Sequence, residues 1–423
     1  MGTLFLKNII LDGKPVDISI SGGKISRIRP SGAEVPPSGA EISDCTGRVA
    51  MPAFVNMHTH AAMTLLRGMQ EDVVFYRWIE NIWDMESRLD ADVIYNGTKV
   101  AALEMIRTGT CTFNDQYWYA LDAHRAAAEM GIRPAISFVF LDFGKPDEIA
   151  KQKDICQKMY EGSRNWTDGS LFTVSCHAVY TVSAEVFQWA KDFCRKHDLR
   201  LHIHLCETRK EVEDCKAAHG GLSPVEYLDR LGVLDDKTIA AHCLWLSDED
   251  VEILGKRRVN CVHNINSNLK IASGIRFRYN ELRDAGANIC IGTDGCASSN
   301  NLDMLEAMKT SAIVQKAWRE DPTALPLPEL LNAATINGAK ALGLDTGRIA
   351  EGALADILII DTDSSFFLSP APFLSNFVYS AHSNCIESVI AGGRFVMKDH
   401  QIEGEKDILS SARGVLGKII KPS

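Results

Sequence analysis

The middle of the chain alternates short apolar runs with longer stretches whose apolar residues recur at helical spacing. Eight such runs occupy 53–57, 109–114, 135–140, 171–175, 200–205, 238–241, 259–262 and 287–291. Short runs that are apolar throughout are typical of strands buried on both faces of a parallel sheet. The stretches between them, such as 92–108, 122–130 and 183–196, predict covering helices. Eight such units fit the length of a (β/α)8 barrel of the TIM type, and we predict this α/β fold for residues 53–345.

Both ends of the chain have a different pattern. Residues 1–50 contain short apolar stretches separated by turn dipeptides such as Asp12-Gly13 and Gly22-Gly23. Similar short strands return after about residue 346, at 355–361, 387–391 and 394–397. The first group is too small to stand alone. We therefore predict that 1–52 and 346–423 pair into one small β-sandwich domain, with the barrel inserted between its halves.

Composition and charge narrow the class of protein. The chain has 423 residues, of which 46% are hydrophobic and 24% charged, and its formal net charge is −10. The negative charge argues against a nucleic-acid or anionic-membrane partner, and no apolar stretch reaches the ~20 residues of a membrane span. The 12 cysteines are scattered without a CxxC pair, so we predict free thiols and a cytoplasmic location. The charge leaves homo-oligomer formation open.

Polar residues of acid–base or metal-binding type stand at the ends of most predicted strands. The first strand ends in His58 and His60, whose side chains leave an extended chain on the same side. A lone His-x-His pair is also an ordinary polar strand end, but further candidates follow the later strands: His177, His204, Glu207, His242, His263 and Asp294. Active sites of these barrels lie at the carboxyl ends of the strands. Half of the 12 histidines stand at such ends, which predicts one shared pocket.

Three histidines and one aspartate are a ligand set for zinc or a similar divalent ion, with a position left for water. The candidates are His58, His60, His204 and Asp294. Such an ion lowers the pKa of its water towards ~7, and hydrolysis then needs a group that carries a proton to the leaving group. Glu207 is well placed for this, although it could instead be a first-turn acid of the next helix. His202 shares the face of His204 and is either a ligand or a barrel residue one layer below.

Four stretches around these positions carry a resemblance to a known family. They are Phe-Val-Asn-Met-His-Thr-His at 54–60, His-Ile-His-Leu-Cys-Glu-Thr at 202–208, Ala-His-Cys at 241–243 and Gly-Thr-Asp-Gly at 292–295. They resemble the amidohydrolase superfamily and, more closely, its 5′-methylthioadenosine/S-adenosylhomocysteine deaminases. Supporting stretches at 60–68, 267–274 and 297–303, together with 355–357, extend the resemblance nearly from end to end.

The resemblance implies a metal-dependent deaminase that converts an adenosine-type nucleoside to its inosine analogue and ammonia. One divalent metal, Zn2+ first and Fe2+ as the alternative, would be bound by the four candidate ligands. Glu207 would be the general acid/base, His242 would polarise the hydroxide or the tetrahedral intermediate, and Asp294 would also take the water proton. His177 would contact the purine and Glu86 the ribose hydroxyls. Trp83, with Trp78, would form an aromatic wall or pack in the core. Ser267 and Asn268 are expected to be loop structure.

The predicted third strand departs from the family. It ends Ser137-Phe138-Val139-Phe140, without the arginine that would grip the carboxylate of S-adenosylhomocysteine. The departure favours 5′-methylthioadenosine, adenosine or 5′-deoxyadenosine, unless Lys145 or Arg164 substitutes.

Other functions on the same scaffold remain open. They are a guanine- or pterin-type deaminase, an aminofutalosine deaminase and a triazine-type chlorohydrolase; a non-catalytic binding protein is a further class. A leaving chloride needs no proton, so Glu207 together with His242 favours deamination. Glu86 with His177 favours a nucleoside over a bare base.

Overall fold

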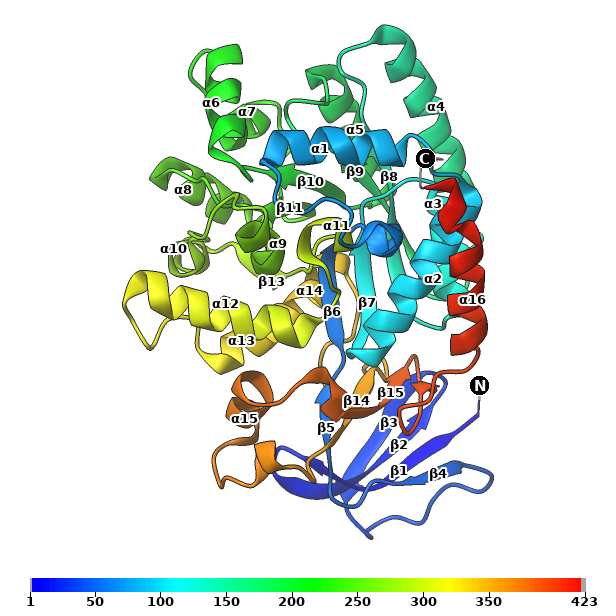
Figure 1. Ribbon diagram of the computed structural model, residues 1–423. Coiled ribbons are helices and arrows are strands. Elements are labelled where there is room, and N and C mark those ends of the chain that lie inside the picture. The colour runs from blue at the N-terminus through cyan, green and yellow to red at the C-terminus, as the bar shows by residue number, and fades with distance from the viewer. Residues whose placement is uncertain (1, 420–423) are drawn as a thin grey trace.

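The barrel predicted for the middle of the chain is confirmed. The computed structural model describes residues 2–419. Eight parallel strands follow one another in chain order (Figure 1): β6 Phe54–Thr59, β7 Thr110–Asp115, β8 Arg133–Phe140, β9 Leu171–Cys176, β10 Leu201–Leu205, β11 Thr238–His242, β12 Asn260–His263 and β13 Asn288–Ile291. Almost every residue in them is buried, which explains why their sequences are apolar runs rather than alternating patterns.

Hydrogen bonds at the exits of β6 and β13 join the two ends of this sheet. The side chain of Asn56 donates to Thr293 Oγ1 at 2.7 Å and accepts from Thr293 N at 3.1 Å. Asp294 N donates to the carbonyl of His58 at 2.9 Å. A Cβ atom on Gly292 would lie 2.9 Å from His58 N, so this seam requires glycine there. The seam brings His58 and Asp294, far apart in the sequence, side by side.

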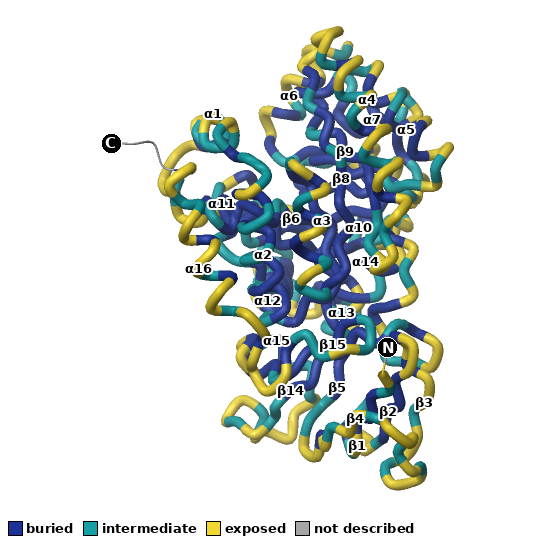
Figure 2. Tube along the Cα trace, turned by 90° about the vertical axis from the view of Figure 1, so that its right-hand side faces the viewer, coloured by how far each residue is buried: buried dark blue, intermediate teal, exposed yellow. Residues whose placement is uncertain are grey.

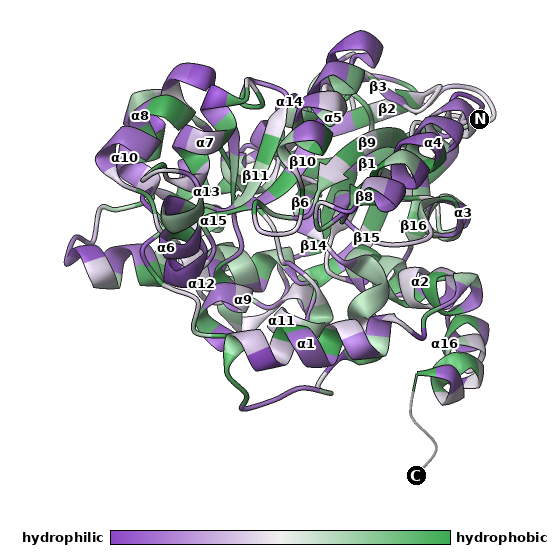
Figure 3. Ribbon diagram, turned by 90° about the horizontal axis from the view of Figure 1, so that it is seen from above, coloured by the Kyte–Doolittle hydropathy of each residue, from purple (hydrophilic) through white to green (hydrophobic). Residues whose placement is uncertain are grey.

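Helices surround the strands, with polar residues in purple on the helices and hydrophobic residues in green on the strands (Figure 3). The helices of the ring are α2 Ala91–Arg107, α3 Ala120–Glu129, α4 Pro146–Ser163, α5 Ala184–His197, α6 Arg209–Ala218, α7 Pro224–Arg230, α8 Asp248–Arg257, α10 Tyr279–Ala285, α12 Met304–Arg319, α13 Leu327–Ala334 and α14 Ile336–Leu342. Several begin at side-chain caps: Asp90, Ser183 and Thr208 each accept a hydrogen bond from the amide three residues on.

Short helices occupy the loops at the carboxyl ends of the strands. They are the 3-10 helix η1 Ala61–Leu66 and the α-helices α1 Phe75–Glu86, α9 Ile265–Lys270 and α11 Cys296–Ser299. In Figure 1, α1 lies beside the upper end of the barrel, where the strands end. Side chains for a site can therefore come from both the strand ends and these helices.

The strands of both chain ends form one second sheet, as predicted. It orders β16 Arg394–Met397, β15 Ile386–Ala391, β14 Ile357–Asp361, β5 Arg48–Pro52, β1 Leu4–Leu11, β2 Lys14–Ser21 and β3 Lys24–Pro30, and β4 Glu41–Asp44 pairs with β1. The halves meet where β5 and β14 run antiparallel, with Met51 opposite Leu358. The division into domains at 52/53 and 345/346 stays a prediction.

Two features tie the second sheet and the C-terminal region to the barrel. Arg133, at the start of β8, donates to Asp356, just before β14, at 2.8 Å, and both side chains are buried. Helices α15 Phe373–Tyr379 and α16 Glu405–Val415 complete the C-terminal part, and α16 runs along α2 (Figure 1). Arg107 of α2 pairs with Glu405 of α16 at 2.7 Å.

Burial follows this architecture. The barrel strands are buried almost throughout, and exposed positions concentrate on outer helices and on turns of the second sheet (Figure 2). All 12 cysteines are free and buried, which confirms the prediction of unpaired thiols. Within residues 2–419, no helix has the length and apolar character needed to cross a membrane. The cytoplasmic location itself stays a prediction.

Candidate metal centre and active site

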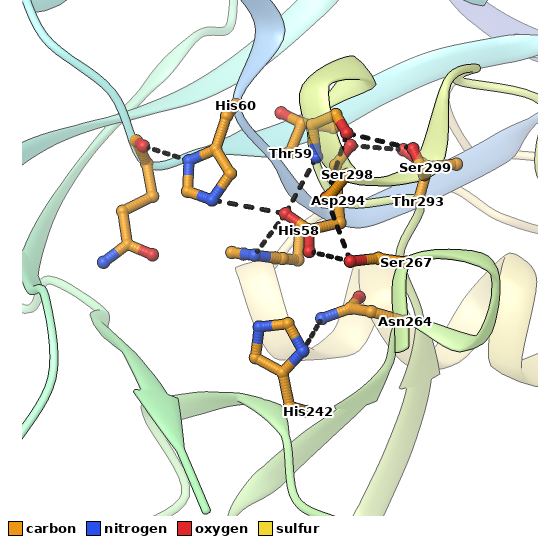
Figure 4. Close-up of polar contacts among 12 residues, drawn as sticks. His58, Thr59, His60, His242, Asn264, Ser267, Thr293, Asp294, Ser298 and Ser299 are labelled. Atoms are coloured by element: carbon orange, nitrogen blue, oxygen red, sulfur yellow. Dashed lines mark hydrogen bonds and ion pairs between the residues drawn. The ribbon is translucent and has the colours of Figure 1, made fainter. Parts of the chain in front are cut away.

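Three histidines and one aspartate converge at the seam of the barrel. The β6 pleat turns His58 and His60 to the same side, and each Nε2 atom lies 3.3 Å from Asp294 Oδ1 (Figure 4). Ligand atoms of His58, His60 and His204 lie within 4.8 Å of one another, as do those of His58, His242 and Asp294. The four candidates predicted from the sequence are therefore brought together, with His242 beside them.

The ring nitrogens of these histidines are arranged to bind a metal ion. His58 Nδ1 lies 3.0 Å from His202 Nε2, and His60 Nδ1 lies 2.6 Å from the carbonyl of Gln116. By contrast, Nε2 of His204 is buried without a hydrogen-bond partner among the described residues, and Nε2 of His58 has only its 3.3 Å contact with Asp294. His58 and His60, each held at Nδ1 and turned with Nε2 towards Asp294, are arranged as metal-binding histidines commonly are. His202 lies behind His58 as the support of this ring.

The electrostatics of the cluster favour a cation. Burial opposes charge on His60, but the neighbouring Asp294 carboxylate outweighs it and raises the pKa of His60 to about 9. Burial likewise opposes charge on Asp294, yet its contacts with His58 and His60 hold the pKa of this carboxyl well below its usual range. Asp294 is thus a buried anion, and such an anion needs a positive partner.

Glu207 and His242 face each other next to the cluster, with Glu207 Oε2 3.7 Å from His242 Nε2. Burial, reinforced by the charges of Asp294 and Glu211, raises the pKa of Glu207 well above its usual range, which favours its protonated form. Burial lowers the pKa of His242 to about 3, which leaves its ring neutral. The pair therefore offers a proton donor and a neutral imidazole to anything bound at the cluster.

The backbone is strained at these strand exits. His242 has φ +79° and Asp294 has φ +63°, and Cys206, immediately before Glu207, has φ +53°. Residues other than glycine rarely adopt this left-handed region. Strain of this kind gathers at functional sites, where the surrounding structure holds it.

The loop structure expected for Ser267 and Asn268 is wrong. Both lie in α9 and are fully buried. Ser267 Oγ donates to Asp294 Oδ2 at 2.6 Å, and Asn268 Nδ2 lies 2.9 Å from His242 Nδ1. These contacts hold the polar sequence of this stretch in a helix, which local propensity alone would not predict.

Glu211, in α6, is a further residue that the sequence analysis missed. Its carboxyl group accepts hydrogen bonds from the amides of Cys206 at 2.9 Å and Glu207 at 2.8 Å. Burial raises the pKa of Glu211 to about 7 despite these bonds. The spacing Thr208-Arg-Lys-Glu211 is a capping-box pattern and was the signal that could have found it. Glu211 fixes the backbone from which Glu207 projects.

The cluster opens into a narrow inner pocket of about 70 Å³, lined by His60, His177, His204, Glu207, His242 and Asp294 on one side and by aromatic residues of α1 on the other. Trp78 and Trp83 both line it, and the Trp83 ring centroid lies 6.1 Å from that of His177. Burial, with a smaller effect of His60, lowers the pKa of His177 to about 3. The inner pocket is thus aromatic on one wall, with the neutral imidazoles of His177 and His242 in its lining.

A wider outer chamber of about 660 Å³ adjoins the inner pocket. Five residues line both spaces and mark the passage between them: Trp83, Glu86, Tyr117, Trp118 and Val139. Burial raises the pKa of Glu86, against the opposing effects of Tyr117 and His60. Glu86 therefore stands where a ligand would pass from the inner pocket to the outer chamber.

Three predicted candidates lie elsewhere. His263 ends β12 but stacks on Phe277 at a centroid distance of 4.3 Å and does not line either space. Lys145 and Arg164 also line neither of them. Helix α4 instead contributes Glu148, Lys151 and Gln152 to the outer chamber, residues that the sequence analysis did not consider.

Comparison with known proteins places this fold and site in one class. Residues 49–396 match the Amidohydrolase family, and the chain belongs to that family. It is 42% identical over 382 residues to the 5′-deoxyadenosine deaminase of Methanoregula boonei, which covers 90% of this chain and 86% of that protein. It is 40% identical over 394 residues to 5-methylthioadenosine/S-adenosylhomocysteine deaminase 1 of Archaeoglobus fulgidus, covering 93% and 92%.

A solved structure supports the same placement. An adenosine deaminase from Xanthomonas campestris with bound zinc superposes with a TM-score of 0.92 at 30% identity, and the match covers 98% of both chains. The resemblance stated from the sequence is thereby confirmed. Family membership together with the converging histidines and aspartate identifies the cluster as a site for a divalent metal.

Proposed function

We propose that this chain is a metal-dependent hydrolytic deaminase of adenosine-type nucleosides. The observation that carries the proposal is the position of Glu86 between two spaces of different character. The inner pocket, with Glu207 and His242 beside the metal cluster, fits a purine ring. The outer chamber fits the 5′ substituent of the ribose. A carboxylate at the junction accepts hydrogen bonds from ribose hydroxyls, which a bare base lacks. The relatives named as nucleoside deaminases support this choice.

The roles of the residues follow from their states. When bound by His58, His60, His204 and Asp294, a divalent ion supplies hydroxide as nucleophile at neutral pH. Glu207, whose pKa is raised by burial, donates a proton to a ring nitrogen and makes the adjacent amine-bearing carbon a better electrophile. His242 donates a hydrogen bond to the oxygen that joins this carbon. Asp294 takes the remaining proton of the attacking oxygen and passes it to the amine nitrogen, so that the carbon–nitrogen bond breaks and ammonia leaves. The first proton of the water restores Glu207.

The remaining contacts orient the nucleoside. His177, neutral and at the wall of the inner pocket, contacts the purine, and Trp83 packs against the ring from α1. We assign Zn2+ as the metal, with Fe2+ as the alternative, because nitrogen ligands with one carboxylate suit both and the Xanthomonas campestris deaminase structure contains zinc.

The outer chamber favours an uncharged 5′ group. Its wall at the end of β8 is formed by Ser137, Phe138 and Val139, with no arginine. Among the described residues, Lys151 is the cation that lines it, and this side chain pairs with Glu148 at 3.5 Å on the exposed face of α4. A free amino-acid carboxylate would find no bidentate partner there. We infer that 5′-deoxyadenosine, 5′-methylthioadenosine and adenosine are better substrates than S-adenosylhomocysteine.

The test is ammonia release by metal-loaded enzyme from these four nucleosides and from guanine, measured side by side. We expect turnover of the first three, little of S-adenosylhomocysteine and none of guanine. Adding an arginine by Ser137→Arg should improve S-adenosylhomocysteine relative to 5′-deoxyadenosine. Activity on guanine alone, or on none of the five compounds, would overturn the nucleoside assignment.

A further inference from the structure

His242 is held from behind by two buried asparagines. Asn268 Nδ2 lies 2.9 Å and Asn264 Nδ2 lies 3.4 Å from the same atom, His242 Nδ1 (Asn264 in Figure 4). Both asparagines are fully buried. The structure turns the NH2 group of each amide towards Nδ1, and an NH2 group only donates, so Nδ1 accepts in this arrangement. A neutral imidazole that accepts at Nδ1 carries its single proton on Nε2.

The Asn268 side chain is itself fixed by the turn that follows α9. Its Nδ2 also donates to Ser273 Oγ at 3.1 Å, and Ser273 N donates back to the carbonyl of Asn268 at 3.1 Å. Trp245, three residues after His242, donates from Nε1 to the carbonyl of Ser273 at 2.7 Å. The loop that carries His242 and the turn that carries Asn268 are thus joined at Ser273.

We propose that Asn268 is a positioning residue that keeps the ring proton of His242 on Nε2, and that Ser273 and Trp245 hold Asn268 in the orientation this requires. The Nε2 atom faces the pocket, where it lies 3.7 Å from Glu207. With its proton there, His242 is a hydrogen-bond donor towards an oxygen forming at the metal cluster; with the proton on Nδ1 it would present a lone pair. The use of this donor in catalysis rests on the proposed function, whereas the tautomer does not.

The direct test is nitrogen NMR of the metal-loaded wild-type protein with ring-15N histidine, the His242 signals being assigned by their loss in His242→Gln. We expect the Nε2–H tautomer. The measurement needs neither substrate nor turnover, so it stands even if the nucleoside assignment fails. A His242 ring protonated on Nδ1 would overturn the proposal.

Asn268→Asp is the sharpest variant, because it keeps the shape of the side chain and replaces the donor by a carboxylate that accepts. We expect the His242 proton to move to Nδ1 and kcat to fall by about 10²–10³-fold, the usual loss when one such donor is removed. KM and metal content should stay near the wild-type values, since the donor acts on the oxygen that forms during the reaction.

Two matched variants distinguish a positioning role of Asn268 from a general loss of structure near the site. Asn266→Asp makes the same chemical change two residues away, where the side chain contacts Glu306 at the surface, and should leave kcat unchanged. Ser273→Ala should lower kcat several-fold, less than Asn268→Asp, with the Nε2–H tautomer still dominant. If Asn268→Asp kept kcat within threefold of wild type, or if it lost its metal together with its activity, Asn268 would not have the proposed role.

Discussion

Removing Arg133 should weaken the attachment of the second sheet to the barrel. Arg133 Nη1 lies 2.8 Å from Asp356 Oδ2, and the two side chains are only 9% and 2% exposed. Breaking a buried ion pair by removing one partner typically costs about 3–5 kcal/mol. Asp356 keeps hydrogen bonds from Thr346 Oγ1 at 2.6 Å and from Gly392 N at 2.7 Å. Because these two hydrogen bonds remain, we expect Arg133→Met to lower the free energy of unfolding by ~3 kcal/mol, the lower end of that range.

The assay is thermal and urea unfolding followed by circular dichroism. At about 2.1 cal/mol/K per residue, a chain of 423 residues has an unfolding entropy of ~0.9 kcal/mol/K, so ~3 kcal/mol should lower Tm by about 3 °C. The matched control is Arg29→Met, which breaks an ion pair to Glu351 whose side chains are 46% and 47% exposed. We expect no measurable change there, because water already screens this pair.

A double variant tests the reasoning itself. Arg133→Met with Asp356→Asn removes both charges and keeps an amide oxygen as an acceptor, so it should recover much of the lost stability, because the cost arises from the unpaired carboxylate rather than from the missing bond. A Tm for Arg133→Met equal to that of wild type would refute the energetic importance of the pair. A double variant less stable than the single one would refute the explanation by an unpaired charge.

Three further outcomes can be measured. Glu207→Gln should retain its metal but lose about 10²–10⁴-fold in turnover, and near wild-type ammonia release would remove its acid/base role. Glu86→Ala should impair nucleosides far more than free adenine, and equal losses would exclude the ribose contact. Burial raises the pKa of Glu211 to about 7, so its folded form binds the proton more tightly than the unfolded chain. Wild-type stability relative to Glu211→Gln should therefore fall by ~3 kcal/mol as pH rises from 4.5 to 7; parallel urea curves across that range would contradict this.

The sequence predicts the barrel well because its strands are buried on both faces. The observed ends of the eight strands lie within two residues of the predicted ones, and the histidines at their exits lie where the barrel topology requires. His263 shows the limit of this reasoning, because it also ends a strand yet stacks on Phe277. A change of one residue in where a strand stops reverses the direction of a side chain, and spacing alone does not reveal it.

The parts that the sequence did not predict depend on contacts between distant segments. Asn268 and Ser267 lie in a polar stretch whose helical form depends on burial against the barrel. The outer chamber is lined by Lys151 and Gln152 because α4 and α1 both border it, and no local pattern encodes that placement. The capping-box spacing could have identified Glu211, but it could not have predicted the hydrogen bond that Glu211 accepts from the amide of Glu207.

The pairing of β5 with β14 has a consequence for how the chain is made. Met51 lies opposite Leu358, and the whole barrel stands between them in the sequence. On the ribosome the N-terminal strands therefore emerge long before their partner exists. Until β14 has been synthesised, β5 is an open edge, and an open edge is a template for pairing with another chain. The nascent protein is thus most prone to aggregate while its barrel is folding, and the last strands to be translated end that interval.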